Sequence, residues 1–364
     1  MNRCAKILIR PDLRACFLAV ALAVTFLVAS TIYAGVPFYV QHNLVSDGFI
    51  PADHMDPNLV NPWGIAFNPW SFSFVWVANN GTGVVTIYDG LGNKQPLEVT
   101  IPGGSPTGIV FSDSLTDFVV TQGASSGPAR FILASEGGFI TAWSPNFASI
   151  TSAVQVVDNS ASGAVYKGLA LAADGTRLLL YATDFHNNKI DVFDSNFSPV
   201  TLAGGFSDSK IPSGYAPFGI CNLNGNLYVT YAKQDQARHD DVPGEGHGFV
   251  NVFNANGNLL RRLASRDHLN SPWGLAIAPA DFGHFSNHLL IGNFGDGTIN
   301  AYDIEKGNFK GQLRQAKGKM LAIDGLWSIS FGNGLQNQPT NVLFFSAGPD
   351  HENHGLYGTI TPEP

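Results

Sequence analysis

Charged residues are scarce in this chain, since Asp, Glu, Lys and Arg make up only 13% of its 364 residues. Average soluble domains carry roughly twice that share. The formal net charge is −8 at pH 7, with 20 basic residues against 28 acidic ones. Nucleic acids and anionic membranes are bound by basic patches, which such a chain can hardly assemble. We therefore expect no nucleic-acid partner, and no membrane partner once an N-terminal export segment is removed.

Cysteine is also rare, with three residues in all, and no Cys-x-x-Cys spacing occurs. Cys4 and Cys16 lie in the N-terminal segment discussed below, which leaves Cys221 without an intrachain disulfide partner. Cys221 occupies a position that holds a small residue in other copies of an internal repeat, so we interpret it as a packing residue. The Gly123–Gly127 stretch matches Gly-x-Ser-x-Gly, but a strand follows it where a nucleophile elbow needs a helix.

A motif of about seven residues dominates what is present. Asn61-Pro62-Trp63-Gly64-Ile65-Ala66-Phe67 returns, with variation, around glycines 108, 168, 219 and 274, and a degenerate sixth copy places Ser328 at the glycine position. The copies lie 44 to 60 residues apart, and short strands with Gly and Asn turns fill the intervals. A recurrence of this length predicts an all-β fold, a six-bladed β-propeller with one motif in the innermost strand of each blade.

Large and small residues alternate within the motif. Trp63, Ile65 and Phe67 are expected on one face of the strand, and Gly64 and Ala66 on the other, closely approached face. Trp63, Trp273 and Trp327 are then core residues; the alternative is that they line a channel in which sugars stack.

A second signature, a strand that ends in an aromatic and a polar residue, marks the third strand of five blades, as in Thr86-Ile87-Tyr88-Asp89. The sixth copy ends the protein, so the last blade lacks a fourth strand. The spare strand from Tyr39 to Val45 is predicted to supply it and to close the ring, which would leave no exposed sheet edge there.

The N-terminus has the pattern of an export signal. Four basic residues, from Arg3 to Arg14, precede an uncharged run over residues 15–38 that contains small residues suited to cleavage. We predict a signal peptide over residues 1–34 and a single propeller domain over residues 35–364. The alternative is an uncleaved membrane anchor. The expected location is outside the cytoplasm: periplasmic, on the cell surface or secreted.

Loops between second and third strands differ most in length between the blades. Blade 4 carries a long insert from Ala232 to Gly248. These loops share one end of the ring with the connections between blades, so a site is predicted there. The candidate ligand-face residues are Asp184, His186, His239, His247, Asn293, His351 and His354.

Acidic residues of the same loops are candidate ligands for a metal ion. Carboxylates favour Ca²⁺ over Zn²⁺, and no EF-hand or His-Glu-x-x-His spacing is present. The alternative is a solvated polar loop without a metal, so no cofactor is required by the sequence and Ca²⁺ is the one candidate. The candidate ligands are Asp240, Asp241, Glu245, Asp296, Asp324, Asp350 and Glu352.

Several segments resemble an exported bacterial six-bladed β-propeller family that often carries PEP-CTERM sorting signals. The resemblance rests on residues 58–64, 158–168, 181–186, 293–297 and 347–350. More distantly the blades resemble NHL-type propellers, which include protein-binding scaffolds, lyases and lactonases. The resemblance implies a propeller and export, and it implies no particular activity.

The sequence is compatible with two functions, and it favours a non-enzymatic function over an enzymatic one. The first is a non-catalytic binding module that presents its loop-rich face to a protein or an envelope polysaccharide. The second is a metal-dependent hydrolase or lyase of the lactonase type, with its site at the channel mouth. Carboxylates or amides from several blades that converge on one point would distinguish the second from the first.

Overall fold

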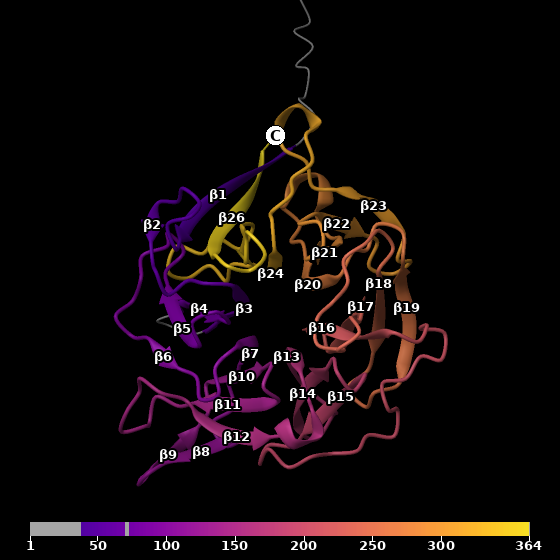
Figure 1. The fold of residues 1–364 in the computed structure, drawn as a ribbon. Coiled ribbons are helices and arrows are strands. Elements are labelled where there is room, and N and C mark those ends of the chain that lie inside the picture. Colours follow the sequence, from indigo (N-terminus) through magenta and orange to yellow (C-terminus); the bar gives the residue numbers. More distant parts are fainter. Residues whose placement is uncertain (1–37, 70–72, 364) are drawn as a thin grey trace, which may run out of the picture. The chain divides into compact units, whose positions relative to one another are not determined.

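Six small β-sheets stand in a ring around a central axis in the computed structural model of the protein, which describes residues 38–69 and 73–363 (Figure 1). This confirms the predicted all-β, six-bladed propeller. Residues Val36–Pro364 form one compact unit. The predicted signal peptide, residues 1–34, lies outside the described residues. Within the described ranges no helix has the length and apolar character needed to cross a membrane.

The blades are numbered in the order in which their innermost strands occur along the chain. Blade 1 holds β3 (Pro62–Phe67), β4 (Val75–Asn79), β5 (Val84–Tyr88) and β6 (Val99–Thr100). Blade 2 holds β7 (Pro106–Phe111), β10 (Phe131–Ser135), β11 (Phe139–Trp143) and β12 (Val154–Asp158). Blade 3 holds β13 (Tyr166–Ala173), β14 (Leu178–Asp184) and β15 (Lys189–Phe193). Blade 4 holds β16 (Tyr215–Leu223), β17 (Asn226–Lys233), β18 (Gly248–Phe253) and β19 (Leu259–Ser265).

Blade 5 holds β20 (Pro272–Ile277), β21 (Leu289–Asn293), β22 (Ile299–Tyr302) and β23 (Phe309–Gln312). Blade 6 holds β24 (Leu326–Phe331), β25 (Leu343–Ala347), β26 (Leu356–Glu363), β1 (Phe38–Ser46) and β2 (His54–Met55). A separate hairpin, β8 (Val119–Gln122) with β9 (Ser125–Pro128), is inserted in blade 2. Three single 3₁₀ turns, η1 (Ser160–Ser162), η2 (Gly283–Phe285) and η3 (Ala316–Gly318), are the helical elements of the described chain.

Two blades have weaker outer edges than the repeat suggests. In blade 1 the fourth strand, β6, pairs over only two residues, Val99 and Thr100. Pro96 and Pro102 flank that segment, and a proline donates no amide hydrogen to a ladder. Blade 3 has a single bridge, between Phe193 and Pro199, where a fourth strand would pair.

The N-terminal strand closes the ring as predicted. β1 pairs antiparallel with β26, from Phe38 opposite Glu363 to Ser46 opposite Leu356, with a bulge between Asn43 and Val45. The Tyr39 hydroxyl further ties β1 to blade 5, since it donates to the Phe282 carbonyl at 3.1 Å and accepts from the Phe285 amide at 3.1 Å. Blade 6 is therefore built from both ends of the described chain.

The repeated motif forms a β-bulge in every blade. The register between innermost and second strands shifts at Pro62/Ile65 in blade 1 and at the matching residues of the other five. A bulge re-aims the side chain within it. Trp63 consequently packs in a central aromatic cluster while Ile65 packs in another cluster between blades, so the expected shared face of these two residues was wrong.

The motif glycines lie where neighbouring blades touch. A Cβ on Gly64 would come 2.6 Å from the Thr107 carbonyl oxygen of blade 2, and one on Gly274 would come 2.6 Å from the Trp327 carbonyl oxygen of blade 6. No real Cβ sits that close to a backbone atom, so the absence of a side chain sets the spacing between blades. The prediction of one closely approached face is thus confirmed.

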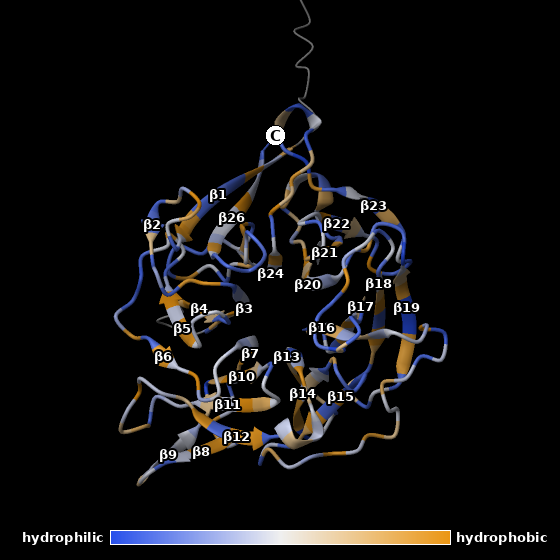
Figure 2. Cartoon of the chain, viewed as in Figure 1, coloured by the Kyte–Doolittle hydropathy of each residue, from blue (hydrophilic) through white to orange (hydrophobic). Residues whose placement is uncertain are grey.

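Hydroxyl groups on second strands link neighbouring blades. Thr183 on β14 donates to the Phe218 carbonyl of blade 4 at 2.7 Å, and Ser346 on β25 donates to the Trp63 carbonyl of blade 1 at 2.5 Å. Apolar residues concentrate in the strands and polar ones in the connecting loops (Figure 2). The buried clusters lie between blades, so packing of sheet on sheet holds the ring together.

Candidate functional site at the channel mouth

The central channel is closed by aromatic side chains from the innermost strands. Trp63 and Trp327 stack with ring centroids 3.4 Å apart, and Trp273 meets both edge-on at 6.1 and 5.8 Å. Phe218 packs against Trp327, with the centroids 5.9 Å apart. All four are buried, so the tryptophans are core residues, as predicted. They stand at the motif position just before the glycine, which every bulge turns toward the axis.

Lys167 occupies this same position in blade 3. Its side chain is 1% exposed, and its Nζ lies 2.5 Å from Glu136 Oε1, 3.1 Å from Asp240 Oδ1 and 5.0 Å from the centre of the Trp63 ring. Burial alone would lower the pKa of Lys167, but the Glu136 and Asp240 carboxylates outweigh it and hold the pKa above its ordinary value. The ammonium group is therefore a permanent positive charge above the aromatic cluster.

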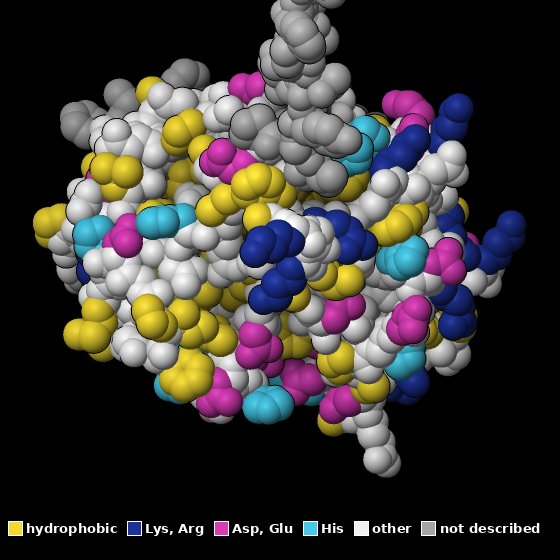
Figure 3. Space-filling model, turned by 90° about the horizontal axis from the view of Figure 1, so that it is seen from above, with side chains coloured by type: hydrophobic (Ala, Val, Ile, Leu, Met, Phe, Trp, Pro, Cys, Tyr) yellow, Lys and Arg dark blue, Asp and Glu magenta, His cyan; other side chains and the backbone are white. Residues whose placement is uncertain are grey.

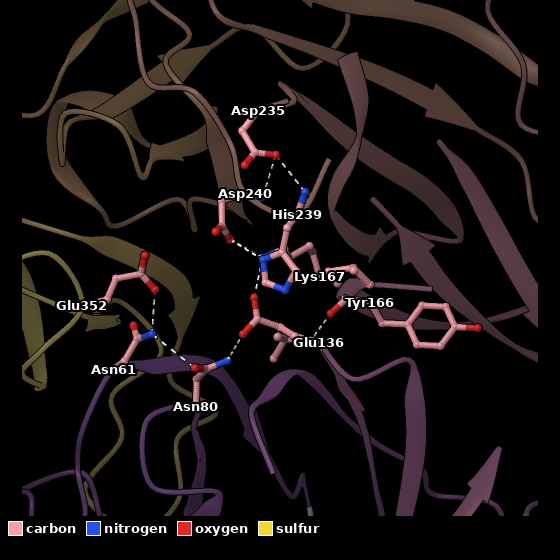
Figure 4. Close-up of polar contacts among 12 residues, drawn as sticks. Asn61, Asn80, Glu136, Tyr166, Lys167, Asp235, His239, Asp240 and Glu352 are labelled. Carbon is pink, nitrogen blue, oxygen red and sulfur yellow. Dashed lines mark hydrogen bonds and ion pairs between the residues drawn. The ribbon is translucent and has the colours of Figure 1, made fainter. Parts of the chain in front are cut away.

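Amides and carboxylates from other blades surround this ammonium group (Figure 4). Asn80, in the β4–β5 loop, donates to Glu136 Oε2 at 2.8 Å, and Asn61, at the entry to β3, donates to Glu352 Oε2 at 2.7 Å. Asn61 Oδ1 in turn accepts from the Trp327 indole at 3.0 Å. Burial raises the pKa of Glu352, although its bond to Asn61 opposes the rise.

We refer to this group as the mouth cluster. It draws on blades 1, 2, 3, 4 and 6, and it consists of Asn61, Asn80, Glu136, Lys167, His239, Asp240 and Glu352. Its members lie on the predicted end of the ring, where the loops between second and third strands meet the entries to the innermost strands.

The long blade 4 insert reaches into the mouth cluster. His239 Nδ1 and Asp240 Oδ1 lie 3.0 Å apart, and Asp235 Oδ1 accepts from the His239 amide at 2.9 Å. One ligand atom each from Glu136, His239 and Asp240 lies within 4.8 Å of the others. Lys167 already donates to both of these carboxylates, so its ammonium group takes the place that a cation would fill.

The other six candidate ligand-face residues lie outside the mouth cluster, and several of them contact neighbouring connections of the chain. Buried Asp184 accepts from the Val165 and Asn187 amides, and buried Asn293 donates to the His268 carbonyl at 2.8 Å. His354 lies 2.6 Å from Asp47 and stacks on Phe49. Three further histidines complete the candidates: His186 is half-buried, His247 is half-buried and 2.8 Å from the Val242 carbonyl, and His351 is exposed.

The candidate metal ligands are spread over the face. Among the described residues Asp240 is the only one of the seven that belongs to a group of three closely spaced ligand atoms. Asp296 accepts from Thr298 and Asn270, Asp324 accepts from the Asp350 amide, and Glu245 is exposed. Asp241 is half-buried with no hydrogen bond to its Oδ2 from the described chain, and burial raises its pKa to about 6.

Four members of the mouth cluster were not among the site residues predicted from the sequence: Asn61, Asn80, Glu136 and Lys167. Lys167 carried a usable signal, because it is the one charged residue at a motif position that four other blades fill with Trp or Phe. Glu136 lies in the β10–β11 loop, which is too short to attract notice by its length.

On the side of the molecule seen in Figure 3, acidic and histidine side chains gather along the lower edge, while Lys and Arg lie nearer the middle and the right. Both signs of charge are thus present on that side.

The opposite end of the channel holds a cavity of about 550 Å³, lined by the carboxyl-terminal halves of the innermost strands. Trp273 forms part of its lining, so the aromatic cluster separates this cavity from the mouth. Cys221 is half-buried in its wall and packs against the hydrophobic cluster that contains Leu275, and burial raises the pKa of its thiol to about 12. These contacts support the interpretation of Cys221 as a packing residue.

The chain was compared with protein-family models, with solved structures and with curated sequences. No protein-family model matches the chain. Among solved structures, a catalytically inactive form of virginiamycin B lyase from Staphylococcus aureus, crystallised with quinupristin, is 13% identical, with a TM-score of 0.51 over 90% of this chain and 99% of the lyase. At that identity the similarity shows the propeller fold alone.

Two sequence relatives come from Acanthamoeba polyphaga mimivirus. Uncharacterized protein R648 is 35% identical over 330 residues, 87% of this chain and 78% of the relative, and Uncharacterized protein L690 is 34% identical over 334 residues, 88% and 85% respectively. These relatives give no support to the expected bacterial PEP-CTERM-associated family. At this identity and coverage, the chain belongs to the same protein family as R648 and L690 of the mimivirus.

Proposed function

We propose that the protein is an exported, non-catalytic binding module that recognises a saccharide at the channel mouth. The observation that supports this is the mutual pairing within the mouth cluster. Lys167 and Asn80 hold Glu136, and Asn61 holds Glu352, so the side chains are fixed before a ligand arrives. Groups that are already ordered lose little conformational entropy on binding, which favours recognition.

The same pairing makes catalysis a weaker proposal. A side chain that acts as a general acid or base must be free to exchange a proton with the substrate. Glu136 is committed to an ammonium group at 2.5 Å and to an amide at 2.8 Å. A lysine whose pKa is raised stays protonated, and a protonated amine is no nucleophile.

A saccharide fits the chemistry of the accessible groups. Amide, carboxylate and imidazole groups offer both donors and acceptors, which sugar hydroxyls match. Asp240, with a side chain 65% exposed, and His239 present such groups to solvent. Half-buried Phe294 stacks on Trp327 with centroids 3.9 Å apart, so the β21–β22 loop adds an aromatic ring to the central aromatic cluster. The acidic loops would repel anionic ligands such as nucleic acid.

Glycan-array binding and isothermal titration with the best saccharides would test this proposal. Asn80→Ala and Asp240→Asn should each weaken binding about tenfold, since each removes a hydrogen bond near the ligand. Asp194→Asn, in the β15 turn of blade 3 away from the mouth, is the matched control and should bind like the wild type. Absence of any saccharide ligand, or equal binding by all three variants, would reject it.

The second candidate, a metal-dependent hydrolase or lyase, is favoured by the convergence of Glu136, His239 and Asp240. Calcium distinguishes the two. With Lys167 in place, a binding module should show no change in melting temperature with Ca²⁺, Mg²⁺ or Zn²⁺. A rise that Asp240→Ala abolishes would instead support the metal-dependent enzyme, because a ligand that binds only the folded state stabilises it.

Export is part of the proposal and rests on the sequence pattern of residues 1–34. Expression of the full chain in a bacterial host, followed by N-terminal sequencing of the protein outside the cytoplasm, tests it. A mature protein that begins near residue 35 would support export and cleavage, and retention of the intact chain in the cytoplasm would reject both.

A further inference from the structure

A second cavity lies between blades 1 and 2, and Phe111 and Asp113 line both this cavity and the cavity at the end of the channel. Its volume is about 710 Å³, within the range of pockets that hold small ligands. Trp76 on β4 and Leu97 just before β6 contribute the wall from blade 1. Phe111 on β7, Phe131 on β10 and Trp143 on β11 contribute the wall from blade 2. The cavity therefore opens at the seam between two sheets.

The aromatic rings of this cavity are packed against each other. Trp76 stacks on Phe131 with centroids 3.7 Å apart and meets Trp143 at 4.7 Å, while Phe111 lies edge-on to Phe131 at 5.3 Å. The Trp143 indole donates to the Ile150 carbonyl at 2.7 Å, so its polar atom is satisfied. The wall is thus rigid and apolar, and it suits a flat hydrocarbon body.

Arg130 supplies a positive charge to a lining that also holds the polar side chains of Asn68, Gln95 and Asp113. Its Nη1 donates to the carbonyl oxygens of Ser112 at 3.2 Å and Ser114 at 3.0 Å, which anchors the guanidinium group. In the described chain no carboxylate comes within ion-pair distance of it, and its Nε and Nη2 make no hydrogen bond to described residues. Exposed Asp113 also lines the cavity, without pairing with Arg130.

We propose that this cavity binds a small amphipathic carboxylate, with the apolar body against Trp76, Phe131 and Trp143 and the carboxylate on Arg130. A partly buried guanidinium group without a counter-ion favours an anion, and its planar pair of N–H donors matches a carboxylate. The apolar walls supply the binding free energy by removing hydrocarbon surface from water. This site does not depend on the mouth cluster or on its proposed ligand.

Titration calorimetry with 2-naphthoate tests the proposal, and 2-naphthalenemethanol is the neutral analogue of the same shape. The wild type should bind the carboxylate at least tenfold more tightly than the alcohol. Arg130→Gln should remove that preference while it retains binding of the alcohol, and Arg130→Lys should keep part of the preference. Asp113→Asn should strengthen binding of the carboxylate about twofold, because it removes a like charge.

Blocking the opening locates the site. Leu115 is 73% exposed and lines the cavity, so Leu115→Trp should fold normally and weaken 2-naphthoate binding at least tenfold. Leu260→Trp, on the outer strand β19, is the matched control. The proposal is overturned if the wild type fails to bind 2-naphthoate at millimolar concentration, if Arg130→Gln keeps the preference, or if Leu115→Trp binds as well as Leu260→Trp.

Discussion

The ammonium group of Lys167 lies 5.0 Å above the ring of Trp63, although the two residues belong to blades 3 and 1. Lysine and tryptophan here occupy the same position of the repeated motif. Each bulge turns that side chain toward the axis, so residues from different blades meet in the middle of the ring. The contact explains how a charged side chain can be 1% exposed: carboxylates pair with it on one side and an aromatic face covers another.

Removal of this charge should be costly. Lys167→Met leaves half-buried Glu136 beside an apolar group. Loss of one partner of a fully buried ion pair costs about 3–5 kcal/mol of unfolding free energy, and the cost here should lie near the lower end of that range. Lys310→Met removes a surface ion pair with Asp303 and should cost far less unfolding free energy. Urea unfolding measures both changes. Combination of Lys167→Met with Glu136→Gln should recover part of the loss, and strict additivity would contradict this account of the pair.

The motif glycines should not accept a side chain. Gly274→Ala places a Cβ against the Trp327 carbonyl oxygen and should destabilise the protein by about 1–3 kcal/mol, since the two blades must move apart. Ser328→Ala is the control, because blade 6 already accommodates a Cβ at this position. Thermal unfolding of both variants provides the comparison. Equal melting temperatures would mean that the contact between blades is looser than the structure indicates.

Ring closure should depend on β1. A chain that begins at residue 48 lacks β1 and exposes the edge of β26, so it should melt at a lower temperature and aggregate. A chain that begins at residue 35 retains the strand and serves as reference. Differential scanning fluorimetry with light scattering follows both effects. An unchanged melting temperature in the shorter chain would contradict the role of this pairing.

Stability should fall with rising pH because of Asp241. Burial raises the pKa of this carboxyl from 3.8 to about 6 in the folded protein, so between pH 4 and 6 the folded state binds more protons than the unfolded state. The free energy of unfolding therefore decreases across this window. Asp241→Asn removes the titration and should be more stable than the wild type by roughly 2–3 kcal/mol above pH 6, with little difference below pH 4. Urea unfolding at pH 4, 5, 6 and 7 measures the difference, and parallel curves would exclude it.

The sequence alone determined the architecture. Three patterns in the sequence predict this architecture: the recurrence of a Trp-Gly motif, the alternation of large and small residues around it, and the spare strand near Tyr39. Each pattern spans only a few residues or follows from counting copies of the motif. The role of the motif glycines could also be predicted from the sequence, because a residue without a side chain at one repeated position indicates a repeated close contact. The six sheets and the pairing of β1 with β26 follow these patterns.

The site was decided by the tertiary structure. Strict alternation predicted that Trp63 and Ile65 share one face of the strand. The bulge in the innermost strand instead turns Trp63 toward the axis, and no residue of the motif indicates that bulge. Glu136 and Asp240 lie 31 and 73 residues from Lys167 in the sequence, and the three meet because ring closure fixes the rotation of every blade. Which loop tips reach the axis depends on blade tilt and loop conformation together. The acidic loops of blades 4 and 6 could therefore be read from the sequence, whereas the pairing of Lys167 with Glu136 of blade 2 and Asp240 of blade 4 could not.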